Sequence, residues 1–112
     1  MKKVSLDQVK PYAAPGHFDV SVLKLSGKEE TGAGKFWVGL SYFLPGGGAE
    51  YGYEDSPTEK VYIVLEGELT VKTKKEEFTL GPMELLYIAP YEGREIINKT
   101  NKPVTMLVAI SY

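Results

Sequence analysis

Few side chains in this sequence offer chemistry beyond simple ion pairing. Arg94 is the only arginine, and its planar guanidinium can bind a carboxylate or a phosphate through two parallel hydrogen bonds. His17 is the only histidine, and the absence of cysteine excludes disulfides, thiolate metal sites and a cysteine nucleophile. The glycines at positions 46–48 are not followed by the Gly-Lys-Ser of a phosphate-binding loop, so they predict a tight turn. Arg94 is therefore the residue whose type points most directly to a ligand, an anion.

Composition and charge narrow the class of protein. The 112 residues are enough for one domain with a single core. A net charge of −2 and a pI near 5.4 give no general attraction to nucleic acid or to an anionic lipid surface. No apolar stretch reaches the length of a signal peptide or of a membrane helix. We therefore expect a cytoplasmic protein with no nucleic-acid partner and no membrane partner.

The elements that must position these groups are strands. Short runs of β-branched and aromatic residues recur roughly every eight to twelve residues, with turn residues between them. The expected strands cover residues 18–22, 36–43, 49–55, 60–65, 68–73, 76–80, 85–88, 94–98 and 104–110. Lys74 and Lys75 are expected at a hairpin tip. This spacing predicts an all-β sandwich or barrel, and a jelly roll is the compact arrangement that leaves few open sheet edges.

Three segments from Pro45 onward carry a family resemblance. They read PGGGAE, EKVYIVLEGELTV and FTLGPMELLYIAP, and they resemble the small single-domain cupins. The resemblance implies a double-stranded β-helix, or jelly-roll barrel, over residues 36–112. It implies that residues 1–35 form an amino-terminal arm and a first strand that pack on the barrel or on a partner subunit. It also implies a homodimer in which the arm is exchanged.

The first cupin motif has a glycine, five residues, His-x-His, three or four residues, a glutamate, six residues and a glycine. With its last glycine on Gly67, the glutamate position falls on Lys60. The two histidine positions then fall on Tyr53 and Asp55. All three metal-binding side chains of this motif are thus replaced.

The second cupin motif ends on an asparagine, which Asn98 can supply. Its histidine position then falls on Arg94, and two of its glycine positions fall on Met83 and Tyr91. A register one residue later would place the histidine position on Glu95 instead. Tyr91, which replaces a glycine, would narrow or cover the mouth of the barrel.

The resemblance bears directly on metal binding. In typical cupins the three histidines and the glutamate hold a divalent metal ion. Here Lys60 and Arg94 are cations that would repel such an ion, so we expect no metal and no other cofactor. One alternative stays open, in which Asp55, Glu59 and His17 bind a metal in a site of their own.

The replaced positions would instead form a polar pocket. If the inward directions of the cupin barrel carry over, Tyr53, Asp55, Lys60 and Arg94 converge, and Tyr62 shares the face of Lys60. Arg94 would bind an anion together with Tyr62, Tyr53 and Tyr91. Lys60, whose proton affinity a second cation would lower, is a candidate catalytic residue with Asp55 and Tyr53. A plain salt-bridge network of Asp55 with Lys60 or Arg94 is the alternative interpretation.

Strand parity adds a further expectation. Residues of opposite parity in a strand face opposite sides, so Glu50 and Glu54 should face outward if Tyr53 faces inward.

Three functions remain open on the sequence. The first is binding of a small oxygenated, anionic metabolite, with a metal-independent isomerase, decarboxylase or lyase step. The second is a non-catalytic module that binds a sugar or an aromatic acid. The third is a metallo-cupin with unusual ligands, a dioxygenase or an isomerase. A dimer interface would suit the outer sheet residues Phe36, Val61 and Ile63.

Overall fold

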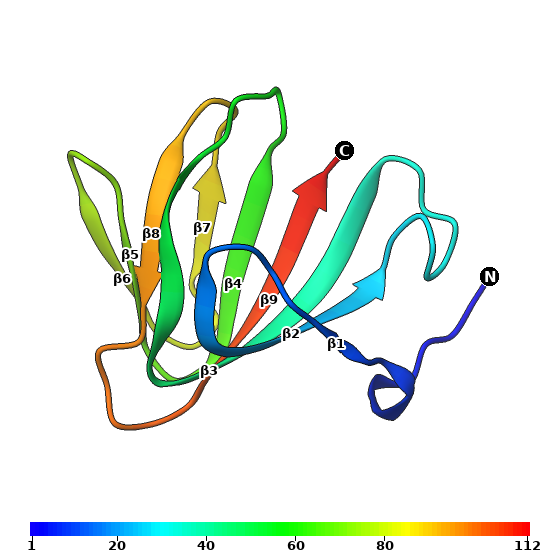
Figure 1. Cartoon of the computed structure of the whole chain (residues 1–112), viewed down its shortest axis with the longest axis horizontal. Coiled ribbons are helices and arrows are strands. Elements are labelled where there is room, and N and C mark those ends of the chain that lie inside the picture. Colours follow the sequence, from blue (N-terminus) through cyan, green and yellow to red (C-terminus); the bar gives the residue numbers. More distant parts are fainter.

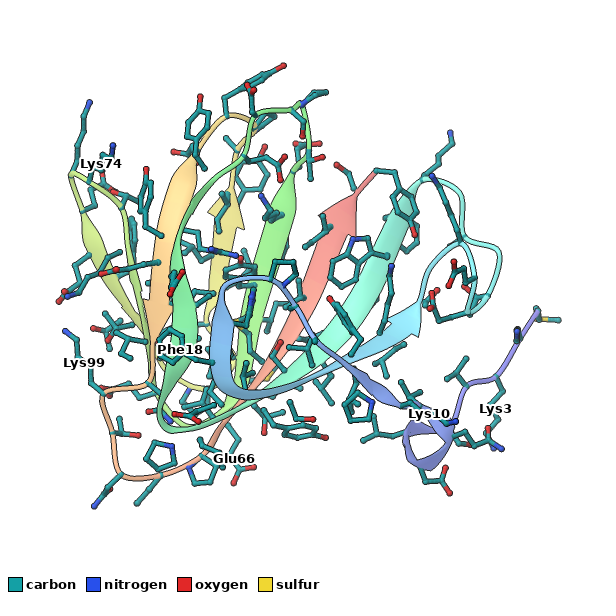
Figure 2. The ribbon with its side chains drawn as sticks, viewed as in Figure 1. Lys3, Lys10, Phe18, Glu66, Lys74 and Lys99 are labelled. Atoms are coloured by element: carbon teal, nitrogen blue, oxygen red, sulfur yellow. The ribbon has the colours of Figure 1, made fainter.

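The computed structural model describes all 112 residues as nine strands and one short 3₁₀ turn, so the all-β prediction is confirmed. The elements are η1 (Leu6–Gln8), β1 (Pro11–Tyr12), β2 (His17–Ser26), β3 (Phe36–Tyr53), β4 (Lys60–Glu66), β5 (Leu69–Lys72), β6 (Glu77–Leu80), β7 (Leu85–Ile88), β8 (Gly93–Ile97) and β9 (Val104–Ser111). Lys74 lies at the tip of the hairpin between β5 and β6, as expected (Figure 2). No helix is long and apolar enough to cross a membrane.

The strands curl into an almost closed antiparallel barrel. Their order in the sheet is β6-β5-β8-β3-β9-β4-β7, and β2 pairs with β3 outside this path. The first half of β3 pairs with β9 and the second half with β8, so β3 curves from one side of the barrel to the other (Figure 1). Crossing connections of this kind are typical of a jelly roll, and the fold prediction is confirmed.

The glycine-rich segment of β3 differs from the prediction. Two strands separated by a tight turn were expected there, and the structure has one continuous strand. A Cβ at Gly48 would lie 2.0 Å from the carbonyl oxygen of Ile96, so only glycine lets β3 come this close to β8. Gly46 alone has a left-handed backbone, with a φ of 80°. The three glycines therefore permit a close crossing within one strand instead of a turn between two.

A buried asparagine, Asn98, stabilises this crossing of β3 and β8 through hydrogen bonds. The side chain of Asn98 is fully buried, and its Nδ2 donates to the carbonyl oxygens of Leu44 and Lys102 at 3.2 and 2.7 Å. Its backbone NH donates to the carbonyl of Gly47 at 2.8 Å. Asn98 thus satisfies a carbonyl group of β3 and one of the loop before β9.

The core lies inside the barrel. Its largest fully buried apolar side chains are Phe43, Leu69, Met106, Val64, Val71 and Val104. The amino-terminal residues lie outside it, where β1 pairs with only two residues of β2. They carry η1, which contains no buried residue, and run away from the barrel in Figure 1.

Three non-glycine residues have a backbone conformation that favours glycine, which are Asp19, with a φ of 48°, and two residues of the second cupin motif. Met83 and Tyr91 have φ angles of 65° and 61°. They are the two residues that the second cupin motif places on its glycines. The backbone of the motif therefore persists here without its glycines, and the agreement at both positions supports the register that ends on Asn98 and selects Arg94, not Glu95.

We expect Met83→Gly to stabilise the protein. A left-handed backbone destabilises a residue with a Cβ by about 1–2 kcal/mol, and glycine is free of this strain. Because glycine loses more backbone entropy on folding, the net gain in the free energy of unfolding is about 0.5–1 kcal/mol. Met83 is 76% exposed, so little packing is lost. Urea unfolding measures the change. Met83→Ala retains the Cβ and is the control; an equal gain from both variants would contradict the explanation.

Candidate functional site

The pairing of β3 with β8 decides which side chains enter the barrel. Ala49 pairs with Ile96, but Gly52 pairs with Arg94, so β3 has one more residue than β8 between these pairs. This bulge shifts the parity of β3, because residues paired across two strands share a face. Gly52 therefore follows Ala49 on the inner face, and the residues after it keep the shifted parity.

The bulge overturns the expected directions of two residues. Tyr53 was expected to face inward and Glu54 outward, and the structure has the reverse. The side chain of Tyr53 is 60% exposed, whereas the carboxylate of Glu54 contacts the amine of Lys60. The parity argument itself is sound, but it assumed a strand without a bulge.

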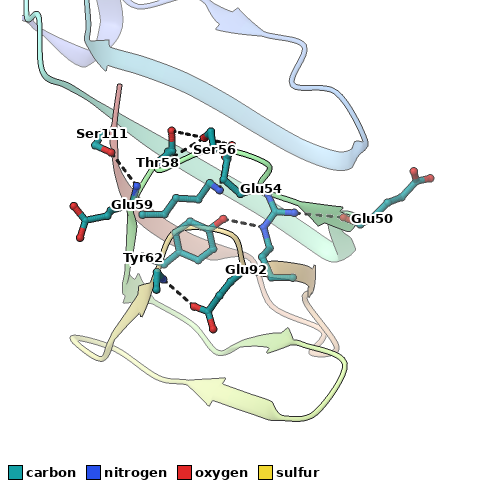
Figure 3. A network of polar contacts seen from close by, with 11 residues as sticks. Glu50, Glu54, Ser56, Thr58, Glu59, Tyr62, Glu92 and Ser111 are labelled. Carbon is teal, nitrogen blue, oxygen red and sulfur yellow. Dashed lines mark hydrogen bonds and ion pairs between the residues drawn. The ribbon is translucent and has the colours of Figure 1, made fainter.

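Arg94 and Tyr62 come together inside the barrel. The Nε of Arg94 donates to the hydroxyl of Tyr62 at 2.9 Å, and its Nη1 donates to the backbone carbonyl of Glu50 at 3.4 Å (Figure 3). Tyr62 is buried, and Arg94 shares the inner face of β8 with Ile96. A cation and a phenol from opposite strands are thus held side by side at the barrel wall.

Lys60 is paired with Glu54. Its Nζ donates to Glu54 Oε1 at 2.7 Å, and its side chain is only 13% exposed. The hydroxyl of Ser56 donates to Glu54 Oε2 at 2.6 Å (Figure 3). The hydrogen bond from Lys60, followed by that from Ser56, lowers the pKa of Glu54 below its ordinary value of 4.5. Glu54 is therefore a carboxylate throughout the neutral range.

The structure does not bring three of the expected site residues to this cluster. Asp55 is exposed, and Lys60 pairs with Glu54 in its place, so the alternative interpretation, an ion pair of Asp55 with Lys60 or Arg94, is wrong. Tyr91 is 53% exposed on the loop before β8. Tyr53, Asp55 and Tyr91 therefore lie on the outer rim of the barrel.

Two glutamates were missed by the sequence reasoning. Glu54 could have been found, because the shorter, three-residue spacing of the first motif puts its histidine positions on Glu54 and Ser56. Glu92 gave no such signal. Its Oε2 accepts a hydrogen bond from the backbone NH of Ala89 at 2.8 Å, and its carbonyl accepts one from the NH of Glu54 at 3.1 Å. The two carboxylate-bearing residues are thus neighbours across the mouth of the barrel.

Two cavities meet at Arg94. One, of about 260 Å³, is lined on its polar side by Thr73, Lys75, Glu76, Tyr87, Glu92 and Arg94. The other, of about 190 Å³, lies deeper and is lined largely by apolar side chains, with Tyr62 and Arg94 at its edge. The carboxylate residues Glu76 and Glu92 line the polar cavity, Tyr62 lines the apolar one, and Arg94 lines both.

The residues at the metal positions do not suit a divalent metal ion. By either spacing of the first motif these positions include Lys60, whose ammonium already holds Glu54, and the second motif contributes Arg94. No group of three or more His, Cys, Asp or Glu side chains is placed to hold a metal. In particular, Glu59 accepts a hydrogen bond from Tyr87, and Nδ1 of His17 lies against a backbone carbonyl. The alternative site of Asp55, Glu59 and His17 is therefore not assembled.

Known proteins share this architecture. Residues 39–110 match the Cupin domain family. A beta-D-galactosidase of Mycobacterium tuberculosis is 40% identical over 114 residues, which cover 100% of this chain and 95% of that protein. The polyketide cyclase of Streptomyces resistomycificus superposes with a TM-score of 0.85 at 23% identity, over 99% of this chain and 79% of that one. A sugar phosphate isomerase of Silicibacter pomeroyi superposes with a TM-score of 0.81 at 22% identity, over 99% of this chain and 76% of that one.

The Glu54–Lys60 pair makes stability depend on pH. Because folding lowers the pKa of Glu54, the stabilisation is present above the ordinary pKa of 4.5 and is lost as the pH falls through the lowered pKa. We expect a carbon NMR titration to find the Glu54 carboxyl titrating below 4.5. Lys60→Met should move this pKa upward, and Lys102→Met, which removes an exposed lysine not paired with Glu54, should not. An unshifted Glu54 pKa in Lys60→Met would contradict the pairing.

Proposed function

The chain is a member of the cupin domain family, and we propose that its barrel binds a sugar and hydrolyses the glycosidic bond of a β-galactoside. The observation that carries the proposal is the pair of carboxylate residues at the barrel mouth, Glu54 and Glu92, joined by a backbone hydrogen bond. The beta-D-galactosidase that is similar over the whole chain supports the choice of sugar.

Glycoside hydrolysis generally needs two carboxyl groups on either side of the scissile bond. One protonates the departing oxygen, and the other attacks the sugar or activates a water molecule. Glu54 suits the second role, because its contacts with Lys60 and Ser56 keep it ionised. Glu92 lines the polar cavity and takes the first role. The bond between sugar carbon and bridging oxygen breaks, and water supplies a hydroxyl to the sugar and a proton to the departing group.

The remaining site residues bind and position the sugar. Arg94 and the hydroxyl of Tyr62 are hydrogen-bonding groups for sugar hydroxyls at the boundary of the two cavities. Lys60 is a positioning residue that holds Glu54. Tyr53, Asp55 and Tyr91 line the outer rim, where they would contact a part of the ligand that extends from the mouth.

A second function is favoured by the positive charge of Arg94 inside the barrel. A guanidinium beside a buried phenol suits a carboxylate ligand. On this alternative the ligand is a small anionic metabolite, and Lys60 carries a metal-independent isomerase, decarboxylase or lyase step. Loss of turnover with retained ligand binding in Lys60→Met would support it. Binding without turnover on a panel of acids and sugars would instead indicate a binding module.

The hydrolysis proposal predicts the effect of two substitutions. Glu54→Gln and Glu92→Gln should each slow the hydrolysis of para-nitrophenyl β-galactoside by about 10²–10⁴-fold, the usual loss when a catalytic acid or base is removed. Release of nitrophenol measures the rate. Glu95→Gln is the matched control, because Glu95 follows Arg94 on β8 and points to the opposite face. A wild-type protein without hydrolytic activity, or a fully active Glu54→Gln, would contradict the proposal.

We also propose that the protein is a homodimer through the outer face of the sheet. Val61 pairs with Tyr87 and Ile63 pairs with Leu85, so these four side chains lie together on the outer face of β4 and β7. Tyr87 and Leu85 are 51% and 54% exposed, and Phe36 is 51% exposed beside the same cavity as Val61 and Tyr87. An exposed apolar surface of this kind suits a protein interface.

A charge on this face should break the dimer. We expect light scattering to give twice the chain mass of 12.4 kDa for the wild type and close to 12.4 kDa for Leu85→Lys. A buried, unpaired lysine at an interface is strongly unfavourable. Leu44→Lys places the same charge on an exposed leucine outside β4 and β7 and is the control. A monomeric wild type at micromolar concentration would count against the dimer.

A further inference from the structure

The deeper cavity is apolar although it adjoins the polar site. Its volume is about 190 Å³, and its lining includes Trp37, Phe43, Ile96, Met106, Val108 and Ile110. Five of its 15 lining residues carry polar side chains, which are Tyr12, His17, Ser41, Tyr62 and Arg94. Arg94 already donates a hydrogen bond to the hydroxyl of Tyr62. The cavity therefore has few groups to satisfy the hydroxyls of a sugar.

This shortage decides which part of a ligand fits the cavity. A hydroxyl moved from water into an apolar space without a new hydrogen bond costs about 1–3 kcal/mol, and a sugar carries several. An aromatic or alkyl group has no such cost. Its size also fits, because an apolar cavity of about 150 Å³ is known to remain dry and to bind benzene.

The two cavities are arranged to separate the two parts of one molecule. Arg94 lines both cavities, so its side chain lies between them, and a ligand with one part in each cavity would contact Arg94. The polar cavity holds Glu92 and Thr73, whose side chains can bond to sugar hydroxyls. The boundary between them is thus the place for the bond that joins a sugar to an apolar group.

We infer that the substrates are β-galactosides of an apolar alcohol or phenol, with the apolar group in the cavity bounded by Trp37, Met106 and Val108. The inference rests on the proposed hydrolysis and adds the class of departing group. When the glycosidic bond breaks, the sugar gains the hydroxyl of water, and the apolar group leaves with the bridging oxygen and a proton as a free alcohol or phenol. A disaccharide, whose departing group carries several hydroxyls, is a poor substrate.

The first experiment measures binding without hydrolysis. Phenyl β-thiogalactoside and methyl β-thiogalactoside carry the same sugar, and sulfur replaces the oxygen that would be protonated. We expect calorimetry to show about 10–100-fold tighter binding of the phenyl compound, the effect of burying one aromatic ring. Val108 is buried on the inner face of β9, and Val108→Phe fills the cavity. This variant should lose the preference and still bind the methyl compound as the wild type does.

Two controls keep the test decisive. Leu107→Phe adds the same kind of ring one residue earlier, on the opposite face of β9, and should retain the preference. If Val108→Phe does not fold, a series of alkyl thiogalactosides on the wild type replaces it. Affinity should then rise about 4-fold for each added methylene until the cavity is full.

The outcomes separate this inference from the proposed function. Equal affinity for the phenyl and methyl compounds, or a preference that persists in Val108→Phe, overturns the apolar departing group and leaves galactoside hydrolysis standing. Failure of both compounds to bind, together with no hydrolysis of para-nitrophenyl β-galactoside, overturns both. A preference that only Val108→Phe abolishes supports the inference.

Discussion

The site depends on one extra residue in the pairing of β3 with β8. The bulge between Ala49 and Gly52 shifts every later residue of β3 to the other face. Without it, Tyr53 would enter the barrel and Glu54 would face the solvent. With it, a carboxylate meets the amine of Lys60, and a tyrosine is left at the outer rim. The close crossing at Gly48 fixes where β3 meets β8, and so fixes the register on which the bulge acts.

Charge balance explains how the barrel holds cations at positions where its family binds a metal. A charged group inside a protein is stabilised only when partners replace its water. Lys60 has Glu54, and Arg94 has the hydroxyl of Tyr62 and a backbone carbonyl. An ion pair and hydrogen bonds between protein groups thus occupy the place that a metal ion and its ligands have in typical cupins. That network divides the interior into a polar space and an apolar one, which is the basis of the proposed ligand selection.

Relative to the family motif, the backbone of this chain differs less than its side chains do. Met83 and Tyr91 retain left-handed conformations at positions where the family motif has glycine. The barrel path therefore persists although its usual chemical groups are replaced. This is why structural neighbours of less than 25% identity share the fold while their names describe different activities. The function proposed here rests on the side chains of the site, together with the relative that is similar along the whole chain.

The sequence alone determined the all-β fold, the jelly-roll barrel and the inward place of Arg94 and Tyr62. The all-β fold follows from the spacing of the strands, which is a local property of the chain, whereas the inward place of Arg94 and Tyr62 follows from the resemblance to the cupin motifs. The continuity of β3, the inward turn of Glu54 and the proximity of Glu92 were decided only by the tertiary structure. A bulge arises from pairing with a distant strand, so the residues of β3 do not by themselves reveal it. The division of the barrel into two cavities likewise depends on side chains from strands far apart in the sequence.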